Sequence, residues 1–321
     1  MKGISDQLMR RGVVPRKFTV FLALASCLSL SPAVQAQDSE PPHAVFVVGT
    51  PHYNPAATMP PLASRLQNLG FRCTVVEPEW DPERNPDGIP GLEVLREADV
   101  AIFYLRFLTL PESQFREIRN YLESGRPVVG LRTSTHAFAY PEGHPLQAWN
   151  DDFGRRALGS KYFIHGKGTT RVQAPAGHEI LTGYDFTTPR PLAGTLYLSD
   201  IPEDATVLLT GTGAFKKTGT VTNAFGTHEL QAEMTDDVAW TWTNEWGGRV
   251  FTTTLGGTHT FRDAHFVRFL LNGIHWAAGQ PVPDPALPAE PIQVNPGNQK
   301  PVAKAPAKLK SRPSAGNRKG E

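Results

Sequence analysis

The feature that most constrains the fold is a repeated alternation of short apolar runs with amphipathic segments in the first half of the chain. Four runs rich in Val, Ile and Phe occupy residues 44–49, 71–76, 99–104 and 127–131. Runs this continuous are typical of strands buried on both faces of a parallel sheet. The order strand, helix, strand, helix predicts a doubly wound, mainly parallel α/β sheet.

Two segments between these runs have the periodicity of amphipathic helices. Pro61–Leu69 places three leucines at helical spacing. Pro111–Ser124 places apolar residues at i, i+3 and i+7, and Thr109 and Glu112 have the spacing of a capping box before it. Both segments are therefore predicted to be helices that pack on the sheet.

The second half of the chain has a less regular pattern. A hairpin is predicted around Gly247-Gly248, because the two segments beside it alternate in hydrophobicity. The long apolar periodicity near the end predicts a last helix that packs on the sheet. The predicted helices are 149–158 and 262–278, and the predicted strands are 168–173, 195–198, 205–210, 238–243 and 249–255.

Charge divides the 321 residues into three parts. The formal net charge is +1, but residues 37–280 hold 20 basic and 27 acidic side chains, a net of −7, between a basic leader and a basic tail. This argues against nucleic acid as a partner, because a nucleic-acid-binding domain carries a basic face. The strand and helix pattern and the length of this middle part predict a single α/β domain over 37–280.

Residues 1–36 have the pattern of a secretory signal peptide. A basic segment precedes the apolar stretch Phe18–Leu30, and Val34-Gln35-Ala36 has the small residues of a cleavage site. The apolar stretch is too short for a membrane span, and none is predicted after cleavage. Export to the periplasm or cell envelope of a bacterium is expected. An alternative is a lipoprotein anchored at Cys27, since residues 24–27 resemble a lipobox.

Residues 281–321 are rich in Pro, Lys and Ala and contain few large apolar side chains. Such a composition cannot bury enough surface to offset its ordering entropy, which predicts a disordered basic tail. An alternative reading is that this tail contacts an anionic surface.

Two pairs of segments carry a family resemblance. Val238–Gly256 and Phe266–Gly279 resemble the C-terminal signature of the ThuA-like, or trehalose-utilisation, family. Pro127–His136 and Trp149–Gly154 resemble its middle segment. The resemblance covers roughly 43–280. It implies a flavodoxin-like fold of the class I glutamine amidotransferase-like superfamily, and an association with carbohydrate metabolism.

The sequence departs from these relatives at two functional positions. The amidotransferases place a nucleophilic cysteine after a strand, where this chain has Arg132. ThuA-like proteins commonly have Leu-Gly-His after a late strand, where this chain has Gly257 in place of the histidine. A guanidinium has no lone pair available for attack, so amidotransferase chemistry is not expected.

The candidate site lies at the carboxyl ends of the predicted parallel strands, where doubly wound sheets bind ligands. His136 and His259 are the candidate acid/base residues. The histidines lack the tight spacing of a metal site, and no metal or cofactor is predicted. Residues predicted to bind substrate are His52, Tyr53, Arg106, Arg132, Thr133 and Ser134, with Trp149, Asp151 and Asp152 in a covering segment.

Hydroxyl groups and planar bidentate donors near aromatic rings suit a polyhydroxylated or carboxylated small molecule. The first hypothesis is an exported ThuA-like protein that binds or transforms a carbohydrate-derived molecule. The alternative is a non-catalytic binding or scaffold module of the cell envelope. The sequence does not decide whether the protein is an enzyme.

Overall fold

The computed structural model describes residues 40–80 and 87–294. The predicted signal peptide, its alternative lipidation site at Cys27 and the chain beyond residue 294 lie outside the described residues. In the described part, the order of elements alternates strand and helix first and then runs mostly through strands. The strands are β1 (His43–Gly49), β2 (Arg72–Val76), β3 (Val100–Leu105), β4 (Val128–Leu131), β5 (Lys167–Gln173), β6 (Arg190–Ala193), β7 (Thr206–Ala214), β8 (Gly219–Asn223), β9 (Gly226–Leu230), β10 (Glu233–Thr243) and β11 (Arg249–Thr253).

The helical elements include short turns as well as three longer α-helices. They are α1 (Pro55–Gln67), η1 (Leu92–Glu97), α2 (Glu112–Glu123), η2 (Arg132–His136), α3 (Trp149–Asp152), the π-helix η3 (Phe153–Leu158), η4 (Glu179–Leu181), η5 (Thr258–Arg262) and α4 (Ala264–Ala277).

Nine strands form one sheet in the order β2-β1-β3-β4-β11-β10-β7-β5-β6. The first five are parallel to one another, and their order is that of a flavodoxin-like doubly wound sheet. The remaining pairs are antiparallel. The predicted fold class is confirmed, with an antiparallel extension added to the parallel half.

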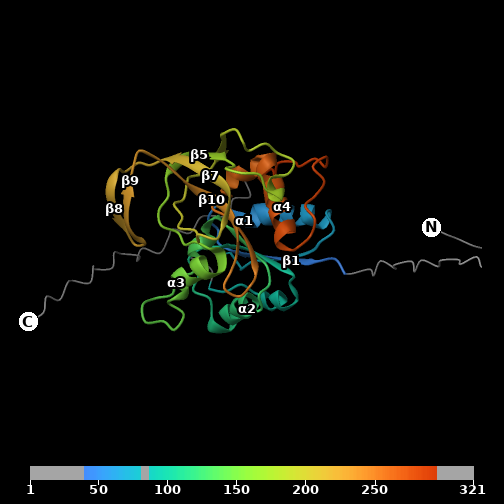
Figure 1. Cartoon of the computed structure of the whole chain (residues 1–321). Helices are drawn as coiled ribbons and strands as arrows, with labels where there is room; N and C mark the ends of the chain where they lie inside the picture. Colours follow the sequence, from blue (N-terminus) through green and yellow to red (C-terminus); the bar gives the residue numbers. More distant parts are fainter. Residues whose placement is uncertain (1–39, 81–86, 295–321) are drawn as a thin grey trace, which may run out of the picture. The chain divides into compact units, whose positions relative to one another are not determined.

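Helices cover both faces of the parallel half (Figure 1), with α1 and α4 on one side and α2 on the other. The packing on one side is close enough to require glycine at residue 273 of α4, because a Cβ there would overlap the Phe251 ring of β11. The strands β1 and β3 are buried along their whole length, which explains their uninterrupted hydrophobicity.

Two details of the predicted helices differ in the structure. Helix α1 begins at Pro55 rather than Pro61, so Pro60 and Pro61 lie inside it. Packing of its buried face, which includes Met59 and Leu62, holds this helix despite the two missing N–H donors. The capping box before α2 is absent, because the Thr109 hydroxyl donates to the Ala139 carbonyl instead.

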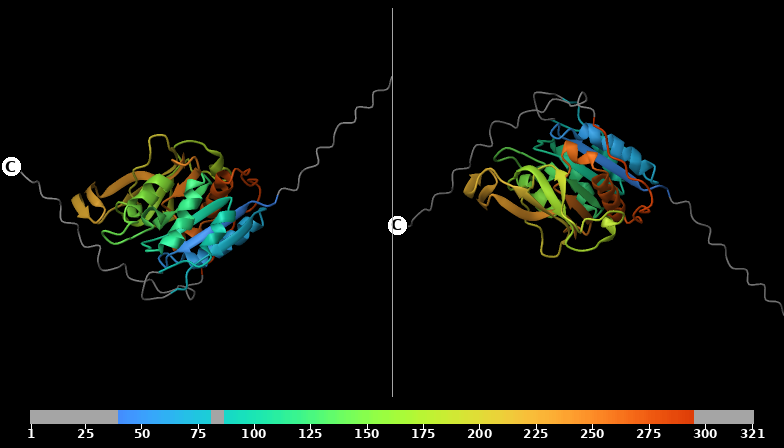
Figure 2. Two further views of the ribbon diagram at one scale, coloured as in Figure 1. Left: turned by 90° about the horizontal axis from the view of Figure 1, so that it is seen from below. Right: turned by 90° about the horizontal axis from the view of Figure 1, so that it is seen from above.

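The predicted strand at 195–198 is wrong. This segment pairs with the irregular segment 164–166 through an isolated bridge between His165 and Tyr197 and through two backbone hydrogen bonds. The neighbouring strand of the sheet is β6 at Arg190–Ala193, which the sequence pattern did not show. Strands β8 and β9 form a separate two-stranded hairpin, which projects beyond the antiparallel end of the sheet (Figure 2).

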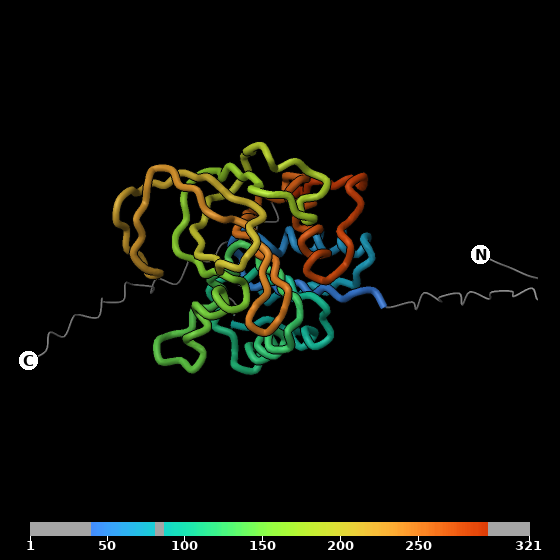
Figure 3. The backbone as a smooth tube through the Cα atoms, viewed as in Figure 1, coloured from blue at the N-terminus to red at the C-terminus, as the bar shows by residue number. Residues whose placement is uncertain are grey.

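The beginning of the predicted tail is packed against the domain. Ile292 and Val294 are buried, and the Ile292 N–H donates to the Phe261 carbonyl at 2.8 Å. Arg65 of α1 donates to the Pro291 carbonyl at 2.9 Å. Figure 3 follows this segment, at the red end of the colour range, back to α1 in blue. The structure therefore adds residues 281–294 to the domain predicted over 37–280.

Candidate functional site

The carboxyl ends of β1, β3 and β4 share an unusual backbone feature. Tyr53 and Asn54 after β1, Phe107 after β3 and Arg132 after β4 all have positive φ angles, between 43° and 65°. They are the four non-glycine residues with positive φ in the described part of the chain. Such conformations are costly for residues with a Cβ, and they concentrate at functional sites. The residues with a strained backbone therefore lie at the carboxyl ends of the parallel strands, where a doubly wound sheet binds its ligands.

Arg132 occupies the sharp turn after β4, and its side chain is 1 % exposed. Its guanidinium lies between the rings of Tyr53 and Tyr197, with Cζ 4.4 Å from each ring centroid. Nη1 donates to the Thr254 carbonyl at 2.7 Å, and Nη2 donates to Thr195 Oγ1 at 3.0 Å and to the Tyr53 hydroxyl at 3.1 Å. Nε is buried and has no hydrogen-bond partner among the described residues.

The partners of Arg132 are carbonyls, hydroxyls and rings, and none of its described contacts is a carboxylate. Arginine remains protonated at physiological pH, so a full positive charge is buried here without a counter-ion among the described residues. Nearby Arg106 is half-buried, and its Cζ lies 4.4 Å from the centroid of the Phe107 ring, again without a described acidic partner. This edge of the sheet is therefore strongly electropositive.

His136, at the end of η2, is 4 % exposed and surrounded by rings. Its centroid lies 4.4 Å from Tyr162 and 4.9 Å from Phe107. Burial, followed by the charge of Arg106, holds the pKa of His136 well below its ordinary value. The imidazole is therefore neutral at physiological pH and can accept a proton.

His52 and Tyr53 complete the half-buried face of the site, their rings in edge contact at 4.1 Å. Burial, with the charges of Arg106 and Arg132, lowers the pKa of His52 to about 4. Burial alone would raise the pKa of Tyr53, but the charge of Arg132 and its hydrogen bond outweigh burial and lower it. These two residues and Arg106 form the accessible face, and Arg132 and His136 lie behind it.

The tip of the β8–β9 hairpin covers His136. The Phe225 ring lies 4.9 Å from Tyr162 and 6.3 Å from both His136 and Phe107. Asn223 at the end of β8 holds the tip in place by donating to the Phe163 carbonyl at 2.9 Å. An element remote from the parallel half thus contributes an aromatic cover to its strand ends.

Some of the residues that were predicted to form the site have a different role or position in the structure. Ser134 is structural, because its hydroxyl donates to the Phe103 carbonyl and accepts from the Leu105 N–H. The Thr133 hydroxyl is buried without a partner beside Arg132. His259 is exposed in η5, and no described polar contact joins it to the strand-end side chains.

The covering segment that was predicted from Trp149, Asp151 and Asp152 does not lie over the site. Trp149 packs against Phe115 on the α2 side of the sheet. Asp151 pairs with Lys161 at 2.7 Å, and Asp152 pairs with an arginine one helical turn on. No described side-chain contact joins these three residues to Arg132 or His136.

Sequence reasoning missed several residues that build the site. Tyr162 and Phe225 lie in segments without regular hydrophobic periodicity, and Thr195 and Tyr197 lie in the segment that was predicted to be a strand. His165 is exposed, and its Nδ1 is 2.6 Å from the Tyr162 hydroxyl. The excess of aromatic residues in these loops was the available signal.

Two further properties of residues 40–80 and 87–294 bear on the predictions. No group of three or more His, Cys, Asp or Glu side chains is placed to hold a metal ion. Within the same residues, no helix has both the length and the hydrophobicity to cross a membrane.

The strand order and the strained turn after β4 define the class of protein, an α/β protein with a flavodoxin-like doubly wound sheet. Within that class the chain belongs to the ThuA family, described as trehalose utilisation, whose model matches residues 45–277. No curated protein sequence matches the chain.

One solved structure supports the fold. A putative ThuA-like protein from Parabacteroides merdae is 17 % identical, covers 76 % of this chain and 92 % of its own, and superposes with a TM-score of 0.51. A cytoplasmic protein from Salmonella typhimurium is 10 % identical over 74 % of this chain and 96 % of its own, with a TM-score of 0.44. The first likeness supports the fold, and the second is too distant to carry an argument.

Proposed function

We propose that this trehalose-utilisation-related protein binds or transforms a carbohydrate-derived small molecule at the ends of β1, β3 and β4. The observation that carries the proposal is Arg132, a buried cation on a strained turn without a carboxylate partner among the described residues. Keeping such a charge buried costs free energy, and an oxygen-rich ligand would offset that cost. Tyr53 and Tyr162 add rings and hydroxyls suited to a sugar.

Covalent chemistry of the amidotransferase type has no support at this site. Arg132 occupies the position of the nucleophile, and a guanidinium does not attack a carbonyl carbon. Cys73, the cysteine in the described part of the chain, lies on the edge strand β2. Burial raises the pKa of its thiol to about 12, so it is not a thiolate at physiological pH.

We propose acid–base chemistry for the case that the ligand is transformed. A neutral His136 can remove a proton from a hydroxyl or from a carbon beside a carbonyl. Arg132, behind Tyr53, would stabilise the negative charge that develops on the ligand's oxygen. Tyr53, whose pKa is lowered, would return a proton to the ligand and regain one from solvent, while His136 releases its proton to solvent.

A thermal-shift screen tests the proposal, using sugars, keto-sugars and sugar acids with and without divalent metals. We expect a ligand whose stabilisation is lost in His136→Ala and kept in His259→Ala, the matched control outside the cluster. If the ligand is not turned over, the protein is a binding module; if turnover is lost in His136→Ala, it is an enzyme. No response to any ligand class would contradict the proposal and favour a scaffold role.

We also infer export to the periplasm or cell envelope, on the basis of residues 1–36. Cell fractionation followed by N-terminal sequencing tests this step separately from binding. A mature chain that begins at Gln37 supports signal-peptide cleavage, one that begins at a modified Cys27 supports a lipoprotein, and an uncleaved cytoplasmic chain contradicts export.

A further inference from the structure

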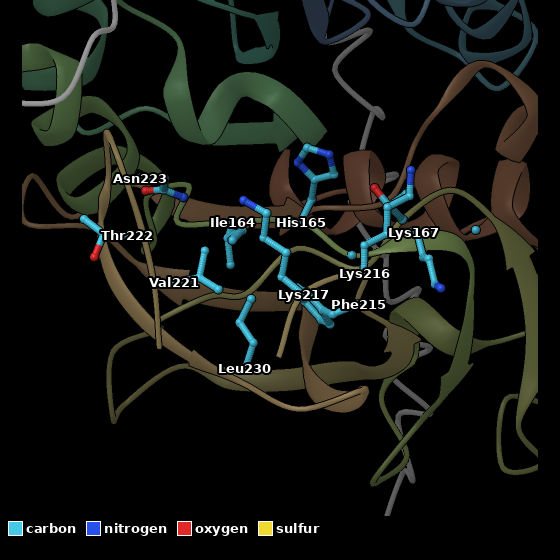
Figure 4. Close-up of a pocket in the computed structure, with 13 residues that line it drawn as sticks. Ile164, His165, Lys167, Phe215, Lys216, Lys217, Val221, Thr222, Asn223 and Leu230 are labelled. Atoms are coloured by element: carbon cyan, nitrogen blue, oxygen red, sulfur yellow. The ribbon is translucent and has the colours of Figure 1, made fainter. Parts of the chain in front are cut away.

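A second feature beside the strand ends is a cavity of about 520 Å³ between the β5–β7 part of the sheet and the β8–β9 hairpin (Figure 4). This volume lies within the roughly 300–1,000 Å³ of small-molecule sites. Its walls are apolar at Ile164, Phe215 and Leu230, and polar at Thr222 and Asn223 of the hairpin.

The cavity gathers positive charge. Lys167, Lys216 and Lys217 line it, and these are three of the four lysines in the described part of the chain. The fourth, Lys161, is paired with Asp151. None of the three lining lysines has an ion pair with a described acidic residue. Three unpaired ammonium groups around one cavity attract an anion.

The cavity and the strand-end cluster share residues. Thr195 lines the cavity and accepts the hydrogen bond from Arg132 Nη2. His165 lines it as well, and its Nδ1 is 2.6 Å from the hydroxyl of Tyr162, which contacts His136. A ligand held in the cavity therefore lies next to the uncompensated charge of Arg132.

We propose that this cavity is the subsite for an oxyanion carried by the ligand, which makes the ligand class an acidic carbohydrate. The inference rests on the proposed function and adds the ligand's charge to it. The lysines bind a carboxylate or phosphate group, and the aromatic strand-end cluster binds the sugar ring to which that group is attached. The hairpin holds both parts, because Asn223 lines the cavity and Phe225 covers His136.

Calorimetric titration of the full chain with glucose, glucuronate and glucose 6-phosphate tests the proposal, since the three share one framework. The exposed pair Lys216→Gln/Lys217→Gln removes two cavity charges. Arg116→Gln/Arg262→Gln removes two exposed charges outside the cavity and is the matched control. We expect one or both acidic probes to bind more tightly than glucose, and the difference to shrink with added salt.

In the lysine variant we expect affinity for the acidic probe to fall about tenfold, as two weakened charge-assisted contacts would produce, with no change in the control. The two acidic probes distinguish a carboxylate from a phosphate. Glucose binding as tightly as both acidic probes, with loss in His136→Ala, would overturn the anionic subsite and leave the proposed function standing. Failure of all three probes to bind would contradict the anionic subsite, whereas the proposed function is contradicted only when the thermal-shift screen also gives no response.

Discussion

Arg132 is the residue on which the account depends most, and its environment is specific to a guanidinium. The planar group is stacked between Tyr53 and Tyr197 and donates to acceptors on three chain segments. A lysine ammonium is a compact charge that can neither stack in this way nor reach all of these acceptors. We therefore expect lysine to be a poor replacement for arginine at this position, although the two side chains carry the same charge.

We expect Arg132→Lys to lower the free energy of unfolding by about 2 kcal/mol, because buried acceptors lose charged hydrogen bonds. Chemical denaturation measures this change. Arg262→Lys, at an exposed arginine of η5, is the control and should leave stability unchanged. Equal stability of the two variants would contradict the role given to the guanidinium geometry.

His52 gives a pH prediction. Its pKa is about 4 in the folded protein, mainly through burial, against 6.5 as the ordinary value. Below pH 6.5 the unfolded chain binds the proton first, so stability falls as pH falls towards 4. Denaturation between pH 7 and 5, above the titration of most carboxylates, should show a weaker pH dependence in His52→Gln. A pH dependence in His52→Gln equal to that of the unsubstituted protein would contradict this assignment.

Among the strands, those that are buried on both faces were easier to predict from the sequence than those that are exposed. Strands β1, β3 and β4 are buried on both faces, so their sequences are continuous apolar runs that were recognised directly. The β8 and β9 strands are mostly exposed and contain few large apolar residues. They pair with each other, but the position of their hairpin depends on contacts with distant segments, such as the hydrogen bond from Asn223 to the Phe163 carbonyl, which a local pattern does not contain.

The residues of the candidate site also differ in how far the sequence could predict them. Tyr53, Arg106, Arg132 and His136 follow predicted strands, and topology alone placed them together. Phe225 joins them from a hairpin whose position depends on Asn223 and on loop packing. Such a residue is found only when the tertiary structure is known.

The hairpin's cover over His136 predicts an effect on titration. Burial is the largest cause of the lowered pKa of His136, and the Phe225 ring contributes to that burial. Phe225→Ala should therefore raise this pKa towards the ordinary value, as measured by NMR titration of the imidazole. Thr220→Ala, at the opposite end of the hairpin, is the control. An unchanged pKa in Phe225→Ala would mean that the hairpin does not cover the site in solution.

At the scale of the whole molecule, the folded domain extends beyond the last helix. Residues 281–294 return to η5 and α1, where Ile292 is 2 % exposed. Their proline-rich composition predicted a tail, because few apolar residues are present. Composition counts apolar residues, but it does not show that Ile292 and Val294 have a place to pack.

Truncation tests this boundary. A chain ending at Val294 should keep the full thermal stability of the protein. A chain ending at Gln280 should melt several degrees lower, because it loses the burial of Ile292, a side chain whose removal from a core costs about 2 kcal/mol or more. Differential scanning calorimetry of the two chains measures the difference, and equal melting temperatures would show that residues 281–294 add nothing to the fold.

The strand ends beside Arg132 and His136 are the proposed binding site for a carbohydrate-derived ligand. The most direct test records the imidazole NMR signals during titration with the compound that gives the largest thermal shift. The account predicts that His52 and His136 respond with one common affinity, while exposed His259 does not. A response confined to His259 or to other histidines outside the cluster would contradict it.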